Sequence, residues 1–323
     1  MNTRPKPPFL AISALVALVA CIMLISFAWP AVNTGPHHLP LAVVAPAPVA
    51  AQLEARLDTA RPGAFDLQPK ISEAEARAAI LNREVYGALL ITPQGPKVLT
   101  ASAASPAAAQ LVAALPALMG APAGPDTVED IVPATASDAR QSGLGGAALP
   151  LVLCGMLSAA LLTQLYTGVG ARLGGLAGVA LLGGFGVTAI LQFWFGTLGG
   201  EYWLNSLVVA LGIAAIGALV QGLESVLGTV GLALGGVSMV LIANPLSALT
   251  SAPELLPAGW GAFGQALPPG AFGTLLRSVA FFDGAGSSTA LLTLVVWVLG
   301  GLGLVVMGTV RRRAVAPVVA QGA

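Results

Sequence analysis

The sequence predicts an α-helical integral membrane protein with about six transmembrane helices and a small α/β extracytoplasmic domain between the first and second helix. Three observations support this prediction. Apolar residues make up 56% of the 323 residues and charged residues only 9%, whereas soluble domains carry about 25% charged residues. Six long runs are almost free of charge. Most of the charge is instead concentrated in residues 31–144.

Each run has about the length that a membrane span requires. A helix needs about 20 apolar residues to cross a hydrocarbon core of about 30 Å. Hydrophobicity is continuous along each run rather than striped, which is typical of a helix without an aqueous face. The fourth and fifth runs share a turn as short as residues 222–225. The expected spans are 9–29, 147–167, 173–198, 202–223, 226–243 and 289–309.

The first run is expected to be a retained signal anchor within an N-terminal segment of residues 1–30. Arg4 and Lys6 precede this run, and its small-residue end would also suit a cleaved signal peptide. However, the apolar region of a signal peptide is usually about 7–15 residues long, and residues 9–29 form a longer run. The other five spans are expected to form one transmembrane domain, residues 145–310.

Basic residues in the short loops predict the orientation of the chain. They precede the first span, separate the second span from the third (Arg172) and follow the sixth (311–313). With six spans, all of these positions fall on one side, and short basic loops favour the cytoplasm. We therefore expect a multi-pass plasma-membrane protein with both termini in the cytoplasm, a cytoplasmic tail at 311–323 and residues 31–144 outside.

Residues 31–144 are expected to fold as a small α/β domain. Strand and helix patterns alternate there, and the order β-α-β-α-β favours a partly parallel sheet. Ser72, with Glu75 three residues later, forms the pattern of a capping box, and residues 93–96 form a turn. The expected strands are 39–44, 64–69, 86–91 and 97–100, the expected helices are 49–59, 73–83 and 106–118, and a Pro/Gly/Ala linker follows at 120–125.

Two pairs of glycines have the GxxxG spacing that is found at close helix crossings in membranes. Gly174 and Gly178 lie in the third expected span, and Gly231 and Gly235 lie in the fifth. We expect these glycines to bring helices close together, although a chain with 40 glycines also produces such spacings by chance.

Sequence motifs for catalysis and cofactor binding are missing. The chain has no GxxxxGK[ST], GxSxG, HExxH or CxxC motif, so we expect neither an enzyme nor a bound cofactor. His37 and His38 are adjacent, and their diverging side chains favour solvated residues beside the membrane over a metal site. Cys21 and Cys154 lie in separate apolar runs and are interpreted as small apolar side chains. The 14 basic and 14 acidic residues cancel, which gives no reason to expect a nucleic-acid partner.

Three carboxylates, Glu201, Glu224 and Asp283, lie at the ends of expected spans. Acidic residues inside a membrane are candidates for proton transfer, but water and headgroups can solvate these positions. We therefore interpret all three as interfacial anchors.

Residues 244–283, after the fifth span, are the most unusual segment of the chain. Proline and glycine recur there with few charges, and irregular backbone at membrane depth persists only where protein or a water-filled cavity satisfies its polar groups. We expect a partly re-entrant or interfacial hairpin with Trp260 and Phe263 at headgroup level; an ordinary extracellular loop is the alternative. The transport or hairpin candidates are Asn244, Pro245, Glu254, Pro257, Trp260, Gln265, Arg277 and Asp283.

Two segments follow a pattern known from a family of permeases. In residues 65–95, a strand precedes a helix with two acidic residues and an alanine, and a second strand ends in Ile-x-Pro; a proline-rich segment with an LPxW-like core precedes the last span. The matching residues are Glu73, Glu75, Ala76, Tyr86, Gly87 and 91–93, and then Leu256, Pro257 and Trp260. With its one span, large outside domain and five further spans, the chain resembles the permease subunits of type-two ABC exporters, in their Pip/YhgE-like (phage-infection-protein) branch.

This resemblance implies a permease that moves a lipid or another hydrophobic molecule outward with a separate ATP-binding subunit, as a homodimer or as half of a pair. The link between the second and third spans, 168–173, is shorter than the coupling helix on which the ATPase of such exporters docks. The alternative is a non-transporting envelope protein in which residues 31–144 bind a partner, a cell-wall component or a phage. A membrane-embedded enzyme is the third and weakest interpretation.

Overall fold

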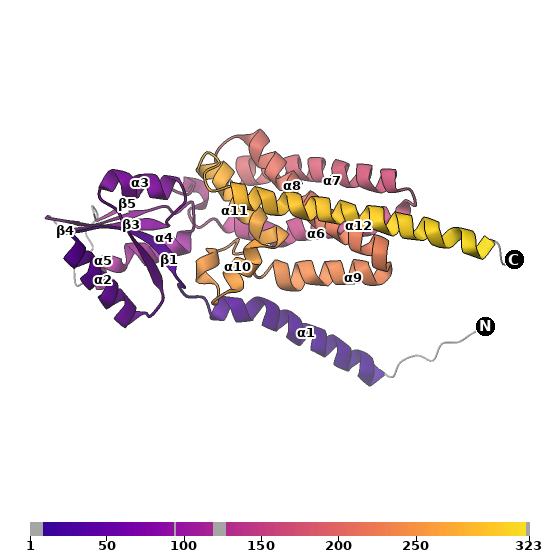
Figure 1. The fold of residues 1–323 in the computed structure, drawn as a ribbon, viewed down its shortest axis with the longest axis horizontal. Helices are drawn as coiled ribbons and strands as arrows, with labels where there is room; N and C mark the ends of the chain where they lie inside the picture. Colours follow the sequence, from indigo (N-terminus) through magenta and orange to yellow (C-terminus); the bar gives the residue numbers. More distant parts are fainter. Residues whose placement is uncertain (1–8, 94, 119–126, 321–323) are drawn as a thin grey trace.

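The computed structural model describes residues 9–93, 95–118 and 127–320, and within them an α/β domain lies at one end of a helical bundle (Figure 1). Helix α1 (Phe9–Val32) leads into the domain, and α6 (Ser142–Leu165) leads out of it. The start of α1 and the end of α12 (Ser288–Ala320) lie at the opposite end of the bundle, which we call the far end. Arg4, Lys6 and the expected linker 120–125 fall outside the described residues.

The α/β domain is built on a five-stranded sheet. Its strands are β1 (Leu39–Val44), β2 (Phe65–Pro69), β3 (Gly87–Thr92), β4 (Gly95–Thr100) and β5 (Val128–Asp130), in the spatial order β2-β1-β3-β4-β5. Strand β1 pairs in parallel with β2 and β3, β3 pairs antiparallel with β4, and β4 pairs in parallel with β5. The expected partly parallel sheet is confirmed, with β5 as an addition that the sequence pattern did not predict.

Helices cover both faces of this sheet. Ala76 and Ile80 of α3 pack in the core on one face, while Leu53, Leu57 and Val112 pack in the core on the other. These helices are α2 (Ala47–Ala60), α3 (Glu73–Leu81), α4 (Pro106–Ala113) and α5 (Leu115–Leu118). The three expected helices are therefore confirmed, except that the last is divided at residue 114, two residues before Pro116, which cannot donate a helical hydrogen bond.

The N-terminus of α3 confirms the cap that the sequence predicts. The Ser72 hydroxyl accepts a hydrogen bond from the Glu75 amide at 3.2 Å. The Glu75 carboxylate accepts from the amide of Ile71 at 3.0 Å, one residue earlier than a capping box requires. Two amides at the start of the helix are thus satisfied.

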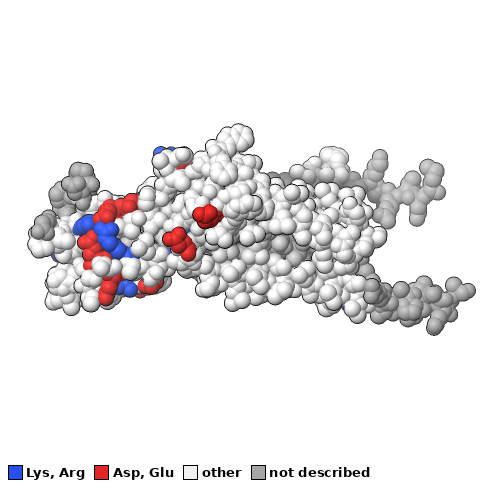
Figure 2. All heavy atoms as spheres, turned by 90° about the horizontal axis from the view of Figure 1, so that it is seen from above, with Lys and Arg blue, Asp and Glu red and all other residues white. Residues whose placement is uncertain are grey.

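Charged side chains gather on the α/β domain and the adjoining end of the bundle, whereas the rest of the bundle in this view is almost free of them (Figure 2). On the domain, Arg77 and Lys97 each contact both Glu73 and Glu129, at N–O distances between 2.6 and 3.0 Å. Such partly exposed ion pairs stabilise a fold little. These charged side chains instead give the α/β domain a polar, water-accessible surface.

Within the described residues, five helices are long and apolar enough to cross a membrane, which indicates a membrane-embedded protein. Helix α8 lies in the middle of the bundle, with 78% of its most apolar stretch buried, and it packs against α6, α7 and α12. Helix α1 stands apart, since Pro30 is its one buried residue. The five helices are α1, α6, α7 with its π-helical end (Val169–Trp194), α8 (Tyr202–Leu227) and α12 over Ser288–Arg311.

The fifth expected span, 226–243, is shorter than predicted, which accounts for five long helices instead of six. Helix α9 (Thr229–Val237) and the π-helical turn η3 (Ser238–Ala243) rise only about 22 Å together. The preceding turn is also displaced, because α8 continues through Glu224 and breaks at Gly228, whose φ is 65°. Glu224 stays in the helix because its carboxylate pairs with the buried Arg172 at 2.9 Å. It is an ion-pair partner at the far end rather than a solvated anchor.

The two GxxxG pairs have different roles. A Cβ on Gly231 would clash with the backbone carbonyl of Leu223 in α8, and a Cβ on Gly235 would lie 3.2 Å from Val220. The prediction of a close crossing is therefore confirmed for this pair. For Gly174 and Gly178 it is wrong within the chain, because an added Cβ at either position meets nothing within 4 Å.

Residues 244–283, called here the hairpin segment, return the chain from η3 to α12 at the domain end of the bundle. The segment contains η4 (Pro253–Leu255), α10 (Trp260–Gln265) and α11 (Pro268–Phe281). Eleven of the 14 residues of α11 are buried, and α11 packs between α8 and α12. The segment is therefore a packed helical hairpin, not an exposed loop.

We expect Gly231→Ala to destabilise the full-length chain by about 1–3 kcal/mol, since the added methyl group has to displace the α8 backbone. Gly174→Ala is the matched control, because its methyl group meets open space and alanine favours a helix over glycine. Thermal unfolding of both variants in one detergent measures the difference. An equal loss of stability in the two variants would contradict the close approach of α9 to α8.

Candidate ligand site at the domain–bundle junction

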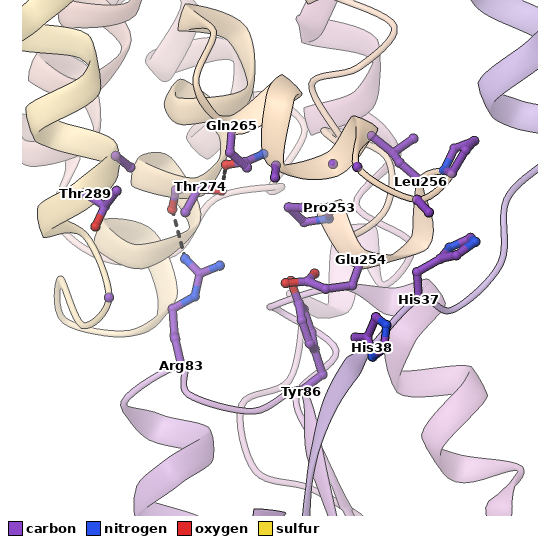
Figure 3. Close-up of a pocket in the computed structure, with 17 residues that line it drawn as sticks. His37, His38, Arg83, Tyr86, Pro253, Glu254, Leu256, Gln265, Thr274 and Thr289 are labelled. Atoms are coloured by element: carbon purple, nitrogen blue, oxygen red, sulfur yellow. Dashed lines mark hydrogen bonds between the residues drawn. The ribbon is translucent and has the colours of Figure 1, made fainter. Parts of the chain in front are cut away.

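A pocket of about 480 Å³, the junction pocket, lies where the α/β domain meets the bundle (Figure 3). Four parts of the chain line it, one of them the start of α12 with Thr289 and Ala290. His37 and His38 come from the segment before β1, Arg83 and Tyr86 from the loop between α3 and β3, and Glu254 from the hairpin segment. The volume lies in the range of small-molecule sites.

Backbone hydrogen bonds fix the segment before β1 against the hairpin segment. The Gly35 amide donates to the carbonyl of Leu255 at 3.0 Å, and the His37 amide donates to the carbonyl of Glu254 at 2.8 Å. This short pairing places His37 in the pocket wall. Its Nδ1 atom is buried and has no hydrogen-bond partner among the described residues.

Arg83 joins the α/β domain to α11. It follows α3 in a left-handed conformation, with a φ of 60°. Its Nη1 donates to the carbonyl of Thr274 at 2.9 Å and to the hydroxyl of Ser278 at 2.6 Å. The guanidinium carbon lies 5.2 Å from the centre of the Phe282 ring, a distance at which a cation is attracted to an aromatic face. The guanidinium is therefore held in one orientation beside the pocket.

Tyr86 and Glu254 form the acidic side of the pocket. Burial raises the pKa of the Tyr86 phenol well above its ordinary value, and the negative charge of Glu254 and a hydrogen bond with it raise the pKa further. The phenol therefore stays protonated beside the Glu254 carboxylate. The Oε2 atom of Glu254 is buried and without a hydrogen-bond partner in the part of the chain that the structure describes.

A second cavity of about 500 Å³, called here the lateral groove, lies between α1, the start of α6 and the hairpin segment. Its lining is mostly apolar and includes Phe27, Ala31 and Leu149. Leu256 lines both the lateral groove and the junction pocket. Charged side chains line the junction pocket, whereas every residue that lines the adjoining lateral groove is uncharged.

The structure distributes the transport or hairpin candidates over both cavities. Trp260 is not among the residues that line either cavity, and its ring lies 5.7 Å from the ring of Trp29 in α1. Glu254, Pro257 and Gln265 line the junction pocket, and Asn244 and Pro245 line the lateral groove.

The last two candidates lie outside both cavities. Arg277 is buried in α11 and donates to the carbonyl of Leu249 at 2.6 Å and to the Gln141 side chain at 3.2 Å. It holds the start of the hairpin segment against the start of α6. Asp283 is exposed in the turn after α11, with a φ of 50°.

Sequence reasoning missed Arg83 and Tyr86 as site residues and misjudged His37 in part. Arg83 reaches Ser278 across 195 positions of the chain, so no local pattern indicates its role. The interpretation of a solvated pair holds only in part for His37, which is half-buried and whose Nδ1 atom is buried. His38 is exposed, although it also lines the pocket.

These features define a class of protein: a helical membrane protein in which an α/β domain and the bundle enclose a pocket with charged side chains between them. No protein-family model, curated protein or solved structure matches the chain.

We expect the stability of the wild-type chain to fall faster than that of Tyr86→Phe above about pH 10. The pKa of Tyr86 is raised in the folded state. The contribution of the protonated phenol to the free energy of unfolding is therefore complete below the unfolded-state pKa of about 10, and it is lost as the pH rises beyond that value. The loss is at most about 1.4 kcal/mol per pH unit. Denaturant unfolding between about pH 9 and about pH 11 measures it.

Tyr166→Phe is the control for this measurement, since Tyr166 is exposed at the far end of the bundle and the variant keeps Tyr86. A pH dependence of Tyr86→Phe that equals that of the wild type would contradict a buried, protonated phenol at position 86.

Proposed function

We infer that this protein binds a lipid or another amphipathic molecule at the junction pocket and the lateral groove. One observation carries this proposal: a cavity with charged side chains and a cavity with an uncharged, mostly apolar lining adjoin at Leu256, so one ligand with a charged head and apolar chains fits both. A soluble polar ligand would leave the apolar groove unused. A purely apolar ligand would leave the buried polar atoms of His37 and Glu254 without partners.

The position of the aromatic rings supports a site at the membrane surface. Trp29 and Trp260 contact each other at the domain end of the spanning helices, and tryptophan is enriched at headgroup level. The junction pocket, beside the charged α/β domain, then lies among headgroups. The lateral groove, beside the apolar helix α1, then lies at the depth of acyl chains.

The orientation that we propose is a plasma-membrane protein of a bacterial envelope, with the α/β domain extracytoplasmic and both termini cytoplasmic. Arg172 and Arg311 support this orientation, because both lie at the far end of the bundle, near the start of α7 and the end of the last spanning stretch. Short basic loops favour the cytoplasmic side.

Two roles are compatible with lipid binding. The first is a permease subunit that resembles type-two ABC exporters and moves its lipid outward with a separate ATP-binding subunit, as a homodimer or in a pair. The second is a non-transporting envelope protein. The far-end connections favour the second, since three residues join α6 to α7 and Gly228 alone joins α8 to α9, which leaves little surface for an ATPase.

We expect Ala31→Trp to weaken lipid binding by at least about tenfold, because the indole fills the lateral groove where the acyl chains would lie. Ala20→Trp is the matched control on the exposed surface of α1, away from the groove. Native mass spectrometry of the full-length protein in detergent, titrated with a defined lipid, measures the dissociation constant. Equal affinity in both variants would contradict the proposed site.

Purification in mild detergent distinguishes the two roles. A non-transporting protein is expected to purify without a nucleotide-binding subunit, and vesicles from cells that contain it are expected to show no ATP-dependent lipid efflux. Repeated recovery of such a subunit in fixed ratio to this chain would instead assign the permease role. Neither outcome decides whether the protein binds lipid, which the comparison of Ala31→Trp with Ala20→Trp tests separately.

A further inference from the structure

We propose that the junction pocket takes the headgroup of an amino-phospholipid, with its phosphate on Arg83 and its primary ammonium on Glu254. The proposal rests on the lipid-binding function above and specifies the class of lipid. It accounts for two groups of opposite charge in one pocket and for a buried carboxylate oxygen that lacks a donor.

Arg83 supplies the phosphate side of the site. Both of its hydrogen bonds, to Thr274 and Ser278, use Nη1, which leaves Nε and Nη2 without a partner in the described ranges of the chain. A guanidinium edge of this kind binds two phosphate oxygens at once. The contacts of Nη1 and the ring of Phe282 already fix the guanidinium, so that little side-chain freedom is lost when a phosphate binds.

Glu254 supplies the ammonium side. Its carboxylate lies beside the Tyr86 phenol, and the buried Oε2 atom has no donor among the described residues. A buried carboxylate oxygen is unfavourable without one. A primary ammonium supplies a compensating charge and three N–H donors, whereas a trimethylated ammonium supplies the charge and no N–H.

The two charged groups face each other across the junction pocket (Figure 3). A headgroup with a phosphate alone would place a second negative charge near Glu254, and a headgroup with a cation alone would place a second positive charge near Arg83. Neither arrangement is favourable where water is partly excluded. A zwitterionic headgroup places its phosphate beside Arg83 and its ammonium beside Glu254, while the acyl chains of the lipid pass Leu256 into the lateral groove.

Three lipids with identical acyl chains test the assignment: phosphatidylethanolamine, phosphatidylcholine and phosphatidylglycerol. Each is titrated into the purified full-length protein in detergent, and native mass spectrometry gives the dissociation constant of the first bound lipid. We expect phosphatidylethanolamine to bind at least about tenfold more tightly than the other two, which is the effect of one charge-assisted hydrogen bond.

Substitutions in the pocket test the roles of Glu254 and Arg83 one at a time. Glu254→Gln keeps the shape of the side chain and is expected to bring the affinity for phosphatidylethanolamine down to that for phosphatidylcholine. Glu84→Gln, at an exposed carboxylate of the same domain, is the control and keeps the preference. Arg83→Lys keeps a charge but not the planar fork, and it is expected to weaken all three lipids alike. Thermal unfolding of each variant confirms that the fold is retained.

The outcomes distinguish the headgroup assignment from the underlying function. Equal affinities for the three lipids, with Ala31→Trp still weakening all of them, would overturn the assignment and leave lipid binding in place. Binding of none of them would overturn both. Glycerophosphoethanolamine, which lacks acyl chains, is expected to compete at least about a hundredfold more weakly; competition equal to that of the whole lipid would overturn a lipid as the source of the headgroup.

Discussion

The arrangement of the whole molecule depends on apolar contacts that the hairpin segment makes with both cores of the α/β domain. Leu255 belongs to the core on the side of α2 and α4, and Phe282 belongs to the core on the side of α3. The domain cannot turn relative to the bundle without exposing these side chains to water, at a cost of about 25 cal/mol for each Å². The junction pocket is therefore a fixed cavity, and the polar contact of Arg83 with Ser278 closes one side of it.

Much of the fold follows from local sequence signals. Continuous apolar length predicts the first, second, third and sixth spans with only small shifts at their ends, and it predicts the fourth span with an end that is too early. The Ser72 cap and the predicted turn between the two strands place α3, β3 and β4 to within about two residues. These features depend on neighbours within a few residues, so the sequence contains the information needed. The hairpin was also expected from proline and glycine in an apolar segment, although its burial against α8 was not.

The errors arise where a distant residue decides the local structure. Glu224 suggests a turn, but Arg172, 52 residues earlier, pairs with it and lets α8 continue. Gly174 and Gly178 have the same spacing as Gly231 and Gly235, and only the fold shows which pair has a helix beside it. In the candidate site, Glu254 could be named from its place in the hairpin segment. Arg83 could not be named in this way, because the residues that it contacts, Thr274 and Ser278, lie more than 190 positions later in the sequence.

Helix α1 is anchored at its domain end and exposed along most of its length, so under the proposed lipid-binding function the lateral groove would open sideways to the surrounding hydrocarbon. A double-chain molecule can then slide in from the same leaflet by diffusion in two dimensions. Its tails never have to be transferred through water, a step that would cost about 0.8 kcal/mol for each methylene group. Exchange at such an opening depends on the composition of the adjacent leaflet rather than on the concentration of free monomer in solution.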